Sequence, residues 1–168
     1  MARSHITMKN SVHSLAAALL VGACASYNGS NLKAGISSEA DARQLMGAPR
    51  MELADGDGTR HLIYPHGPLG TQTFVVDVAP DGRVRRVRQA LGEDTFNVIS
   101  PGMKRDEILR LIGPPGETMT FSRSGQTAWD YRFVDAWGYV AIFSVAFDGQ
   151  GIVVSKFTRR VERDRGAL

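Results

Sequence analysis

An internal repeat constrains the fold of this chain more than any other feature of its sequence. Residues 35–49 resemble residues 102–115, because each stretch begins with a glycine and ends with the pattern Gly-x-Pro. With Gly47 aligned to Gly113, the two copies match after one residue is inserted behind the first glycine. Further along, Asp81-Gly82 corresponds to Asp148-Gly149, and apolar runs flank both pairs. The repeat therefore predicts two similar small units in tandem.

Each copy begins with the signals of a short helix. Ser38 followed by Asp41 approximates a capping box, which marks the start of a helix. In the second copy, the apolar residues 108, 109, 111 and 112 share one helical face. Gly47 and Gly113 suit the left-handed conformation that ends a helix, and the prolines behind them prevent its continuation. Both segments are therefore predicted to be short helices.

Runs that favour β-structure follow each predicted helix. Residues 60–64 and 128–134 form the first of these runs, and two more runs flank each Asp-Gly pair. Asp-Gly between apolar runs is typical of a β-hairpin. Each unit is thus predicted to be short helices packed on a three-stranded antiparallel meander, which makes the chain α+β. Because one small unit buries little surface, the units are expected to pack together or to share one continuous sheet.

The repeat also sets the predicted boundaries. A first unit spans residues 35–92, and a second spans residues 93–158. Residues 159–168 are charged and lack an apolar period, so they are expected to form a solvated tail. Residues 24–34 are largely polar and contain glycine, which predicts a flexible tether ahead of the first unit.

The first 23 residues have the order of a bacterial export signal. Arg3 and Lys9 precede the apolar run 15–23, which is shorter than the roughly 20 apolar residues of a membrane-spanning helix. Cys24, the single cysteine, follows Val21-Gly22-Ala23 directly, as in a lipoprotein. We expect an N-acyl diacylglycerol group, with chains such as palmitate, on Cys24 and no other cofactor. A secretory signal with an unrelated cysteine is the alternative, and both Met1 and Met8 are candidate start positions.

Composition excludes several classes of protein. The chain is 43% hydrophobic, which excludes disorder throughout. Its net charge of +3 falls close to neutral without residues 1–23, so its pI of about 9.3 is poor evidence for a nucleic-acid partner. A single cysteine excludes a disulfide framework and a four-cysteine zinc site.

A family resemblance rests on three motifs behind the predicted lipoprotein cysteine. Residues 102–115 read Gly-Met-x-x-x-Glu-Ile-x-x-x-Ile-Gly-Pro-Pro, residues 129–133 read Trp-Asp-Tyr-Arg-Phe, and residues 147–153 read Phe-Asp-x-x-Gly-Ile-Val. In this order they resemble the SmpA/OmlA (BamE-like) family of outer-membrane lipoproteins. The resemblance is clear over residues 99–157 and weaker over residues 35–87.

The resemblance implies two helices on a three-stranded antiparallel sheet. It also implies a lipoprotein that faces the periplasm, binds subunits of the β-barrel assembly machine and contacts phosphatidylglycerol. Ala25 replaces the aspartate that holds similar lipoproteins at the inner membrane, which favours the outer membrane. This chain departs from the family by having two units, an arrangement that resembles β-lactamase inhibitory protein. Of the family's functional positions, only the lipidated Cys24 carries over.

No catalytic residue and no metal ligand are predicted. The sequence has no Gly-x-Ser-x-Gly elbow, and an acylated cysteine is no nucleophile. His61 and His66 follow Asp55 and Asp57, but His66 stands where a calcium loop that starts at Asp55 needs glutamate. Residues 55–58 are therefore predicted to form a turn.

Partner contacts are predicted at two places. Trp137 and Tyr139 lie at a predicted turn, where side chains need not be buried in the core. Exposed aromatic residues are typical binding anchors. The densest basic cluster has two interpretations: contact with anionic lipid head groups or an acidic partner, or charges that protect an exposed strand from aggregation. The second interpretation is favoured. The cluster consists of Arg83, Arg85, Arg86 and Arg88.

The function favoured by the sequence is that of an outer-membrane lipoprotein that faces the periplasm and acts as a non-catalytic protein-binding module. Its expected partners are envelope proteins, with subunits of the barrel-assembly machine foremost, and the membrane through the lipid anchor. No nucleic-acid partner is expected. An inhibitor of a periplasmic enzyme, as in β-lactamase inhibitory protein, is the alternative. A cell-wall hydrolase ranks lowest, because no acid, base and nucleophile converge in the sequence.

Overall fold

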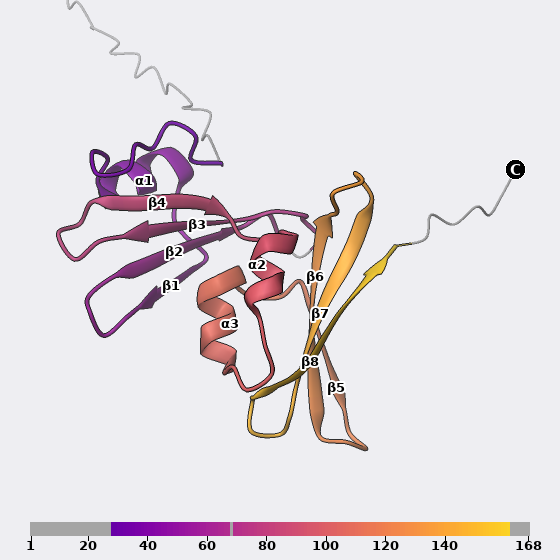
Figure 1. Ribbon diagram of the computed structural model, residues 1–168. Helices are drawn as coiled ribbons and strands as arrows, with labels where there is room; N and C mark the ends of the chain where they lie inside the picture. Colours follow the sequence, from indigo (N-terminus) through magenta and orange to yellow (C-terminus); the bar gives the residue numbers. More distant parts are fainter. Residues whose placement is uncertain (1–27, 68, 162–168) are drawn as a thin grey trace, which may run out of the picture.

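The computed structural model describes residues 28–67 and 69–161 and has an α+β architecture with two antiparallel sheets. The first unit contains α1 (Glu39–Met46), β1 (Met51–Ala54), β2 (Arg60–Pro65), β3 (Thr73–Val78) and β4 (Val84–Gln89). The second contains α2 (Glu93–Val98), α3 (Arg105–Ile112), β5 (Glu117–Phe121), β6 (Gln126–Val134), β7 (Val140–Phe147) and β8 (Val153–Arg160). Figure 1 shows the two sheets on opposite sides of α2 and α3.

The two units repeat the same backbone hydrogen bonds where the helix begins. Gly35 N–H donates to the Val84 carbonyl (2.8 Å), and in the second unit Gly102 N–H donates to the Val153 carbonyl (2.9 Å). At the start of α1 the Glu39 N–H likewise donates to the Gly82 carbonyl, and at the start of α3 the Arg105 N–H donates to the Gly151 carbonyl. Each unit therefore ties the start of its helix to the start of its last strand, which confirms the predicted repeat and its one-residue insertion. The predicted match of Asp81-Gly82 with Asp148-Gly149 is wrong by two residues, because Gly82 takes the place of Gly151.

The predicted helix ends are also confirmed. The Ser38 side chain accepts from the Asp41 N–H, and the Asp41 carboxylate accepts from the Ser38 N–H (2.7 Å), which completes the capping box. Gly47 and Gly113 end α1 and α3 with φ of +82° and +77°, a region that favours glycine. Their ψ values of −164° and −168° differ from the predicted left-handed helical conformation, so that detail is wrong. Both predicted Asp-Gly hairpins are present, between β3 and β4 and between β7 and β8.

The prediction of three-stranded meanders is wrong, because each sheet has four strands in the orders β1-β2-β3-β4 and β5-β6-β7-β8. The additional strands β1 and β5 directly follow the Gly-x-Pro segments. β1 has only four residues, and all five residues of β5 are exposed, so neither carries an apolar run that marks a strand. The alternative of one continuous sheet is also wrong, since the sheets are separate.

The outer boundaries differ from the predictions as well. Arg159 and Arg160 belong to β8, so the solvated tail cannot begin at Arg159. Ahead of the first unit, Gly29 is buried and Leu32 packs against the core, so the expected tether 24–34 ends before Gly29. Arg159 and Arg160 belong to the sheet despite their charge, because their backbones pair with β7, Arg159 with Ile142 and Arg160 with Ala141.

Each sheet has its own core. α1 covers one face of the first sheet, with Met46 and Ala42 packed on Leu62, Tyr64 and Val76. On the second sheet, the inward-facing side chains of β6 and β7 pack under α2 and α3. That core contains Phe96, Ile108, Ile112, Tyr131, Phe133, Phe143, Val145 and Phe147, with Trp129 against it.

The second face of the first sheet approaches α3, which thus lies between the sheets (Figure 1). Ile63, Val75 and Ala90 are buried on that face. A Cβ atom added at Gly113 would lie 2.7 Å from Ile63 Cγ2, so the end of α3 sits directly on the first sheet. Within the two described stretches, no helix is long and apolar enough to cross a membrane.

Candidate functional site

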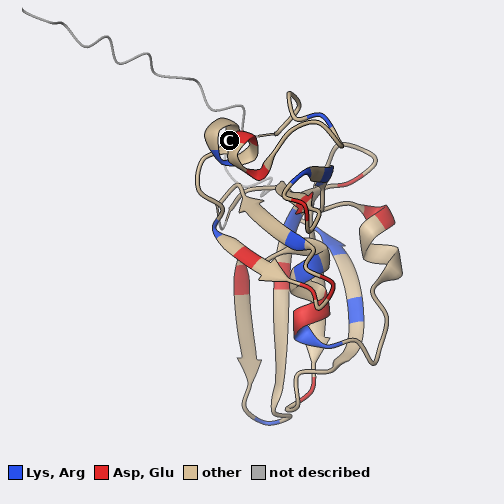
Figure 2. Cartoon of the chain, turned by 90° about the vertical axis from the view of Figure 1, so that its left-hand side faces the viewer, with Lys and Arg blue, Asp and Glu red and all other residues tan. Residues whose placement is uncertain are grey.

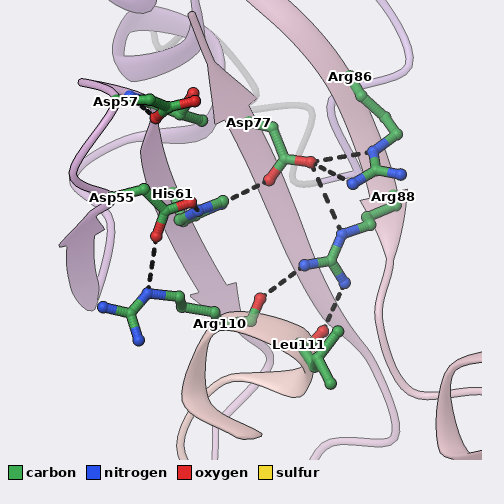
Figure 3. Close-up of polar contacts among 9 residues, drawn as sticks. Asp55, Asp57, His61, Asp77, Arg86, Arg88, Arg110 and Leu111 are labelled. Carbon is green, nitrogen blue, oxygen red and sulfur yellow. Dashed lines mark hydrogen bonds and ion pairs between the residues drawn. The ribbon is translucent and has the colours of Figure 1, made fainter. Parts of the chain in front are cut away.

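A polar cluster fills the space between the first sheet and α3, and Figure 3 shows its members. His61 on β2 lies between two carboxylates. Its Nδ1 is 2.8 Å from Asp77 Oδ1, and its Nε2 is 2.9 Å from Asp55 Oδ2. His61 therefore bridges two acids, Asp55 behind β1 and Asp77 on β3.

Asp77 is the centre of the cluster. The register of the sheet sets His61, Asp77 and Arg86 in one row across β2, β3 and β4. The Asp77 side chain is only 4% exposed, and its Oδ2 accepts from Arg86 Nε (2.9 Å) and Nη2 (2.7 Å). Arg88 Nε lies 3.8 Å from the same oxygen. Two arginines therefore compensate the charge of one buried carboxylate.

Two contacts connect this cluster to the second unit. Arg88 donates from Nη2 to the Arg110 carbonyl (2.7 Å) and from Nη1 to the Leu111 carbonyl, at the end of α3. A cation at this helix end is favourable because the last carbonyls lack partners within the helix. Arg110 Nε in turn lies 2.8 Å from Asp55 Oδ1. We name Asp55, His61, Asp77, Arg88 and Arg110 the inter-unit clamp.

The charges of the clamp alternate in space. Figure 2 shows red and blue positions close together at α3 and on the strands beside it. The hydrogen bond from His61, aided by the charges of His61 and Arg110, lowers the pKa of Asp55 below 3.8. Burial lowers the pKa of Arg88 from its usual value, while the charge of Asp77 opposes that shift. The clamp thus joins the two units through the half-exposed Arg110–Asp55 ion pair and through Arg88, which is largely buried.

The chemistry open to the clamp is structural. A general base needs a ring nitrogen that can accept a proton, and both nitrogens of His61 already face carboxylates. The predicted turn at residues 55–58 is confirmed by a bond from Gly58 N–H to the Asp55 carbonyl (3.0 Å). Asp57 accepts from Thr59 N–H and stays apart from His61, as Figure 3 shows. Across residues 28–67 and 69–161, no group of three acids or histidines could hold a metal.

Acid is expected to weaken the clamp at Asp55. A carboxyl whose pKa is lower in the folded chain contributes stability above its unfolded pKa of about 3.9 and loses it as pH falls through the folded pKa. Asp55→Asn removes this contribution. The drop in unfolding free energy between about pH 5 and about pH 3 should therefore be smaller in D55N than in the parent chain. Urea titration at both pH values measures this drop, and Asp106→Asn, at an exposed position of α3, is the control. Equal drops in the parent chain and both variants would contradict the role of Asp55 in the clamp.

The second candidate site is the hairpin between β6 and β7, which carries two predicted partner-binding residues. Trp137 is 78% exposed and Tyr139 is 56% exposed. Asp135 Oδ1 accepts from the N–H groups of both residues at 2.9 Å. The backbone adds bonds from Asp135 N–H to the Tyr139 carbonyl and from Gly138 N–H to the Asp135 carbonyl. The turn is thus held in one conformation while both aromatic rings face solvent.

Arg160 of β8 braces the same hairpin. Its Nε lies 2.7 Å from Asp135 Oδ2, and its guanidinium carbon lies 4.8 Å from the centroid of the Tyr139 ring. A cation over an aromatic face is attractive, and the ring loses rotational freedom there. We name Asp135, Trp137, Tyr139 and Arg160 the aromatic hairpin.

The predicted arginine cluster is divided by the fold. Arg86 and Arg88 point toward α3 and bind Asp77, while Arg83 donates from Nη1 to the Ile36 carbonyl (2.8 Å). Arg85 is exposed, and its charge helps to lower the pKa of Asp57, after the hydrogen bonds from Thr59. The four arginines therefore do not form one surface, and their contact with lipid or an acidic partner stays a prediction. Cys24, the predicted lipidation site, lies outside the described residues.

Sequence reasoning missed the inter-unit clamp. One signal was present, because Asp77 interrupts the apolar run 74–78. An acid in a fully buried strand needs a charged partner nearby. The partner's identity depends on strand register and on the placement of α3, which local sequence patterns do not specify.

Comparisons with known proteins add limited information. No family model matches the chain, and no curated protein matches it. Similar solved structures include one assigned as the osmotically inducible lipoprotein OsmE, with 28% identity, a TM-score of 0.35, and coverage of 39% of this chain and 67% of that one. A protein from Streptococcus mutans assigned as a β-lactamase inhibitor protein has 14% identity and a TM-score of 0.32, covering 73% and 82% of the two chains.

A third similar structure is the DUF4309 family protein YjgB from Bacillus subtilis, with 12% identity and a TM-score of 0.31. That match covers 79% of this chain and 84% of the other. All three TM-scores lie below 0.5, and no residue role is taken from these proteins.

Proposed function

We propose that this chain is a lipoprotein anchored through Cys24 to the outer membrane, where it faces the periplasm and acts as a non-catalytic protein-binding module. The proposed partners are envelope proteins, with subunits of the barrel-assembly machine as the first candidates. The observation that carries the proposal is the aromatic hairpin. This hairpin fixes the backbone that carries an exposed tryptophan, and exposed aromatic side chains are typical binding anchors.

The construction of the hairpin supports this role. Tryptophan and tyrosine bring large contact areas, and an anchor that is already ordered loses little entropy when it binds. Asp135 and Arg160 fix the turn without covering Trp137. The inter-unit clamp supports the binding role in a second way, because it joins the two units and limits their relative motion. A lipid anchor would confine the module to the membrane surface and raise its effective concentration near membrane partners.

Photo-crosslinking in cells tests the proposed function. With a photoreactive amino acid at position 137, we expect crosslinks to one envelope protein, because this side chain is 78% exposed on the hairpin. The same substitution at Leu69, which is 80% exposed in the loop between β2 and β3, provides the matched control. Equal capture at both positions, or capture of a cytoplasmic protein at position 137, would contradict the proposal.

A further inference from the structure

The second sheet has an open edge at β8. This strand is last in the order β5-β6-β7-β8, and beyond its first residue no described strand pairs with its outer side. At its beginning, Val153 exchanges hydrogen bonds with Gly102 and Met103. The edge then stays open from Val154 to Arg160. An open edge of this length is a template on which another extended segment can pair.

The register tells which main-chain groups of β8 are open. Val161 N–H donates to the Val140 carbonyl at 2.9 Å, so residue 161 faces β7. Because bonding alternates along an antiparallel strand, Phe157 and Arg159 also face β7. The N–H and C=O groups of Lys156, Thr158 and Arg160 therefore point outward. An added strand would pair with these three residues.

A groove accompanies the open edge. It has a volume of about 300 Å³ and lies between α2 and β8, with Phe96, Phe143 and Phe157 among its lining residues. Phe96 and Phe143 stack with ring centroids 3.9 Å apart and form an apolar wall. Lys156 holds the end of α2 in place by donating from Nζ to the carbonyls of Phe96 (2.8 Å) and Asn97 (3.1 Å). A strand on β8 would thus place alternate side chains in a preformed groove.

The charge of β8 selects the occupant. The strand contains Lys156, Arg159 and Arg160 and no acid. Asp130 lies 3.7 Å from Arg159 and Asp135 lies 2.7 Å from Arg160, but both arginine side chains stay more than half exposed. A second copy is a poor occupant, because antiparallel self-pairing centred on Thr158 would set Lys156 opposite Arg160 of the other copy, and like charges across strands repel. Lys156 and Arg160 share the face of the groove, and Arg159 lies on the opposite face. A segment whose apolar residues enter the groove would therefore set its aspartate or glutamate residues beside Arg159, with opposite charge.

We propose that β8 and its groove bind an extended, acidic segment of a partner protein as a fifth strand of the second sheet. This inference rests on the proposed function and adds the form of the partner. Arg160 belongs to both surfaces, since it contacts Tyr139 and ends β8, so the aromatic hairpin and the open edge are continuous. Main-chain hydrogen bonds supply the affinity, and the groove selects the alternate side chains.

Peptide binding to the purified full chain tests the inference. The probe is a fluorescein-labelled octapeptide of alternating valine and aspartate, and the control replaces each aspartate by lysine. Thr158→Pro removes one outward N–H, and proline is tolerated on an edge strand. We expect T158P to weaken binding of the aspartate peptide by about tenfold or more. Thr158→Val keeps the N–H and should bind as the parent does. Arg159→Glu, which leaves the backbone intact, should weaken it by about fivefold.

Amide hydrogen exchange gives the decisive readout. The aspartate peptide should protect the amides of Lys156, Thr158 and Arg160, while Phe157 and Arg159 keep the protection that β7 gives them. Binding without this pattern, equal binding of both peptides, or no binding at about 1 mM would overturn the inference. Self-association that T158P abolishes would overturn the acidic occupant in favour of a second copy. If these tests fail while crosslinking at position 137 succeeds, the proposed function stands without this inference.

Discussion

Asp77→Asn is expected to lower the free energy of unfolding by about 3 kcal/mol. The substitution keeps the shape of the side chain and removes its charge. Arg86, Arg88 and His61 would then face a neutral amide on a nearly buried site. Removing one partner of a buried ion pair is costly because the remaining charges lose their compensation while they stay partly out of water.

Urea denaturation of D77N measures this loss. The matched control is Asp81→Asn in the turn between β3 and β4, where the side-chain oxygen accepts from Arg83 N–H (3.0 Å). Asparagine keeps that acceptor, so D81N should stay within about 0.5 kcal/mol of the parent chain. Losses of equal size in the two variants would show that the inter-unit clamp adds no stability of its own.

Gly113→Ala is expected to cost about 3 kcal/mol, against about 1 kcal/mol for Gly47→Ala. Both glycines end the helix of their repeat with positive φ, so alanine is strained at either position. Only at Gly113 does the new methyl group also meet a neighbour, 2.7 Å from Ile63 Cγ2 and 3.1 Å from Thr73 Cγ2. At Gly47 nothing lies within 4 Å. The difference between the variants therefore reports the contact of α3 with the first sheet.

A double-mutant cycle isolates this contact. Ile63→Ala removes the Cγ2 atom that the new methyl group would strike. In the I63A background, the added cost of G113A should fall toward that of G47A, as chemical denaturation would measure. An unchanged cost of G113A in that background would place the strain elsewhere and contradict the close approach of the two units.

The parts of the fold that local rules govern were predictable. The Ser38–Asp41 capping box, the glycines at the helix ends and the Asp-Gly hairpins each depend on a few neighbouring residues, and all were confirmed. Trp129, Tyr131 and Phe133 alternate along β6 and share its inward face, as the period of two in a strand requires. These features need no knowledge of distant contacts.

Features that depend on long-range placement were not predictable. β1 and β5 are strands because backbone partners exist on β2 and β6, and their side chains give little sign of it. Asp77 is tolerated in a buried strand because register sets it between His61 and Arg86. Arg88 has its role because α3 of the other unit presents open carbonyls to it. The position of the aromatic pair at a turn was predictable, whereas the brace from Arg160 was not.

The affinity for the partner captured at position 137 tests the central claim most directly. Isothermal titration would compare the parent chain with Trp137→Ala. Because an exposed aromatic anchor typically contributes about 2 kcal/mol or more, W137A should raise the Kd by roughly 30-fold while its unfolding midpoint stays unchanged. An equal Kd for W137A and the parent chain would contradict the assignment of the aromatic hairpin as the binding surface.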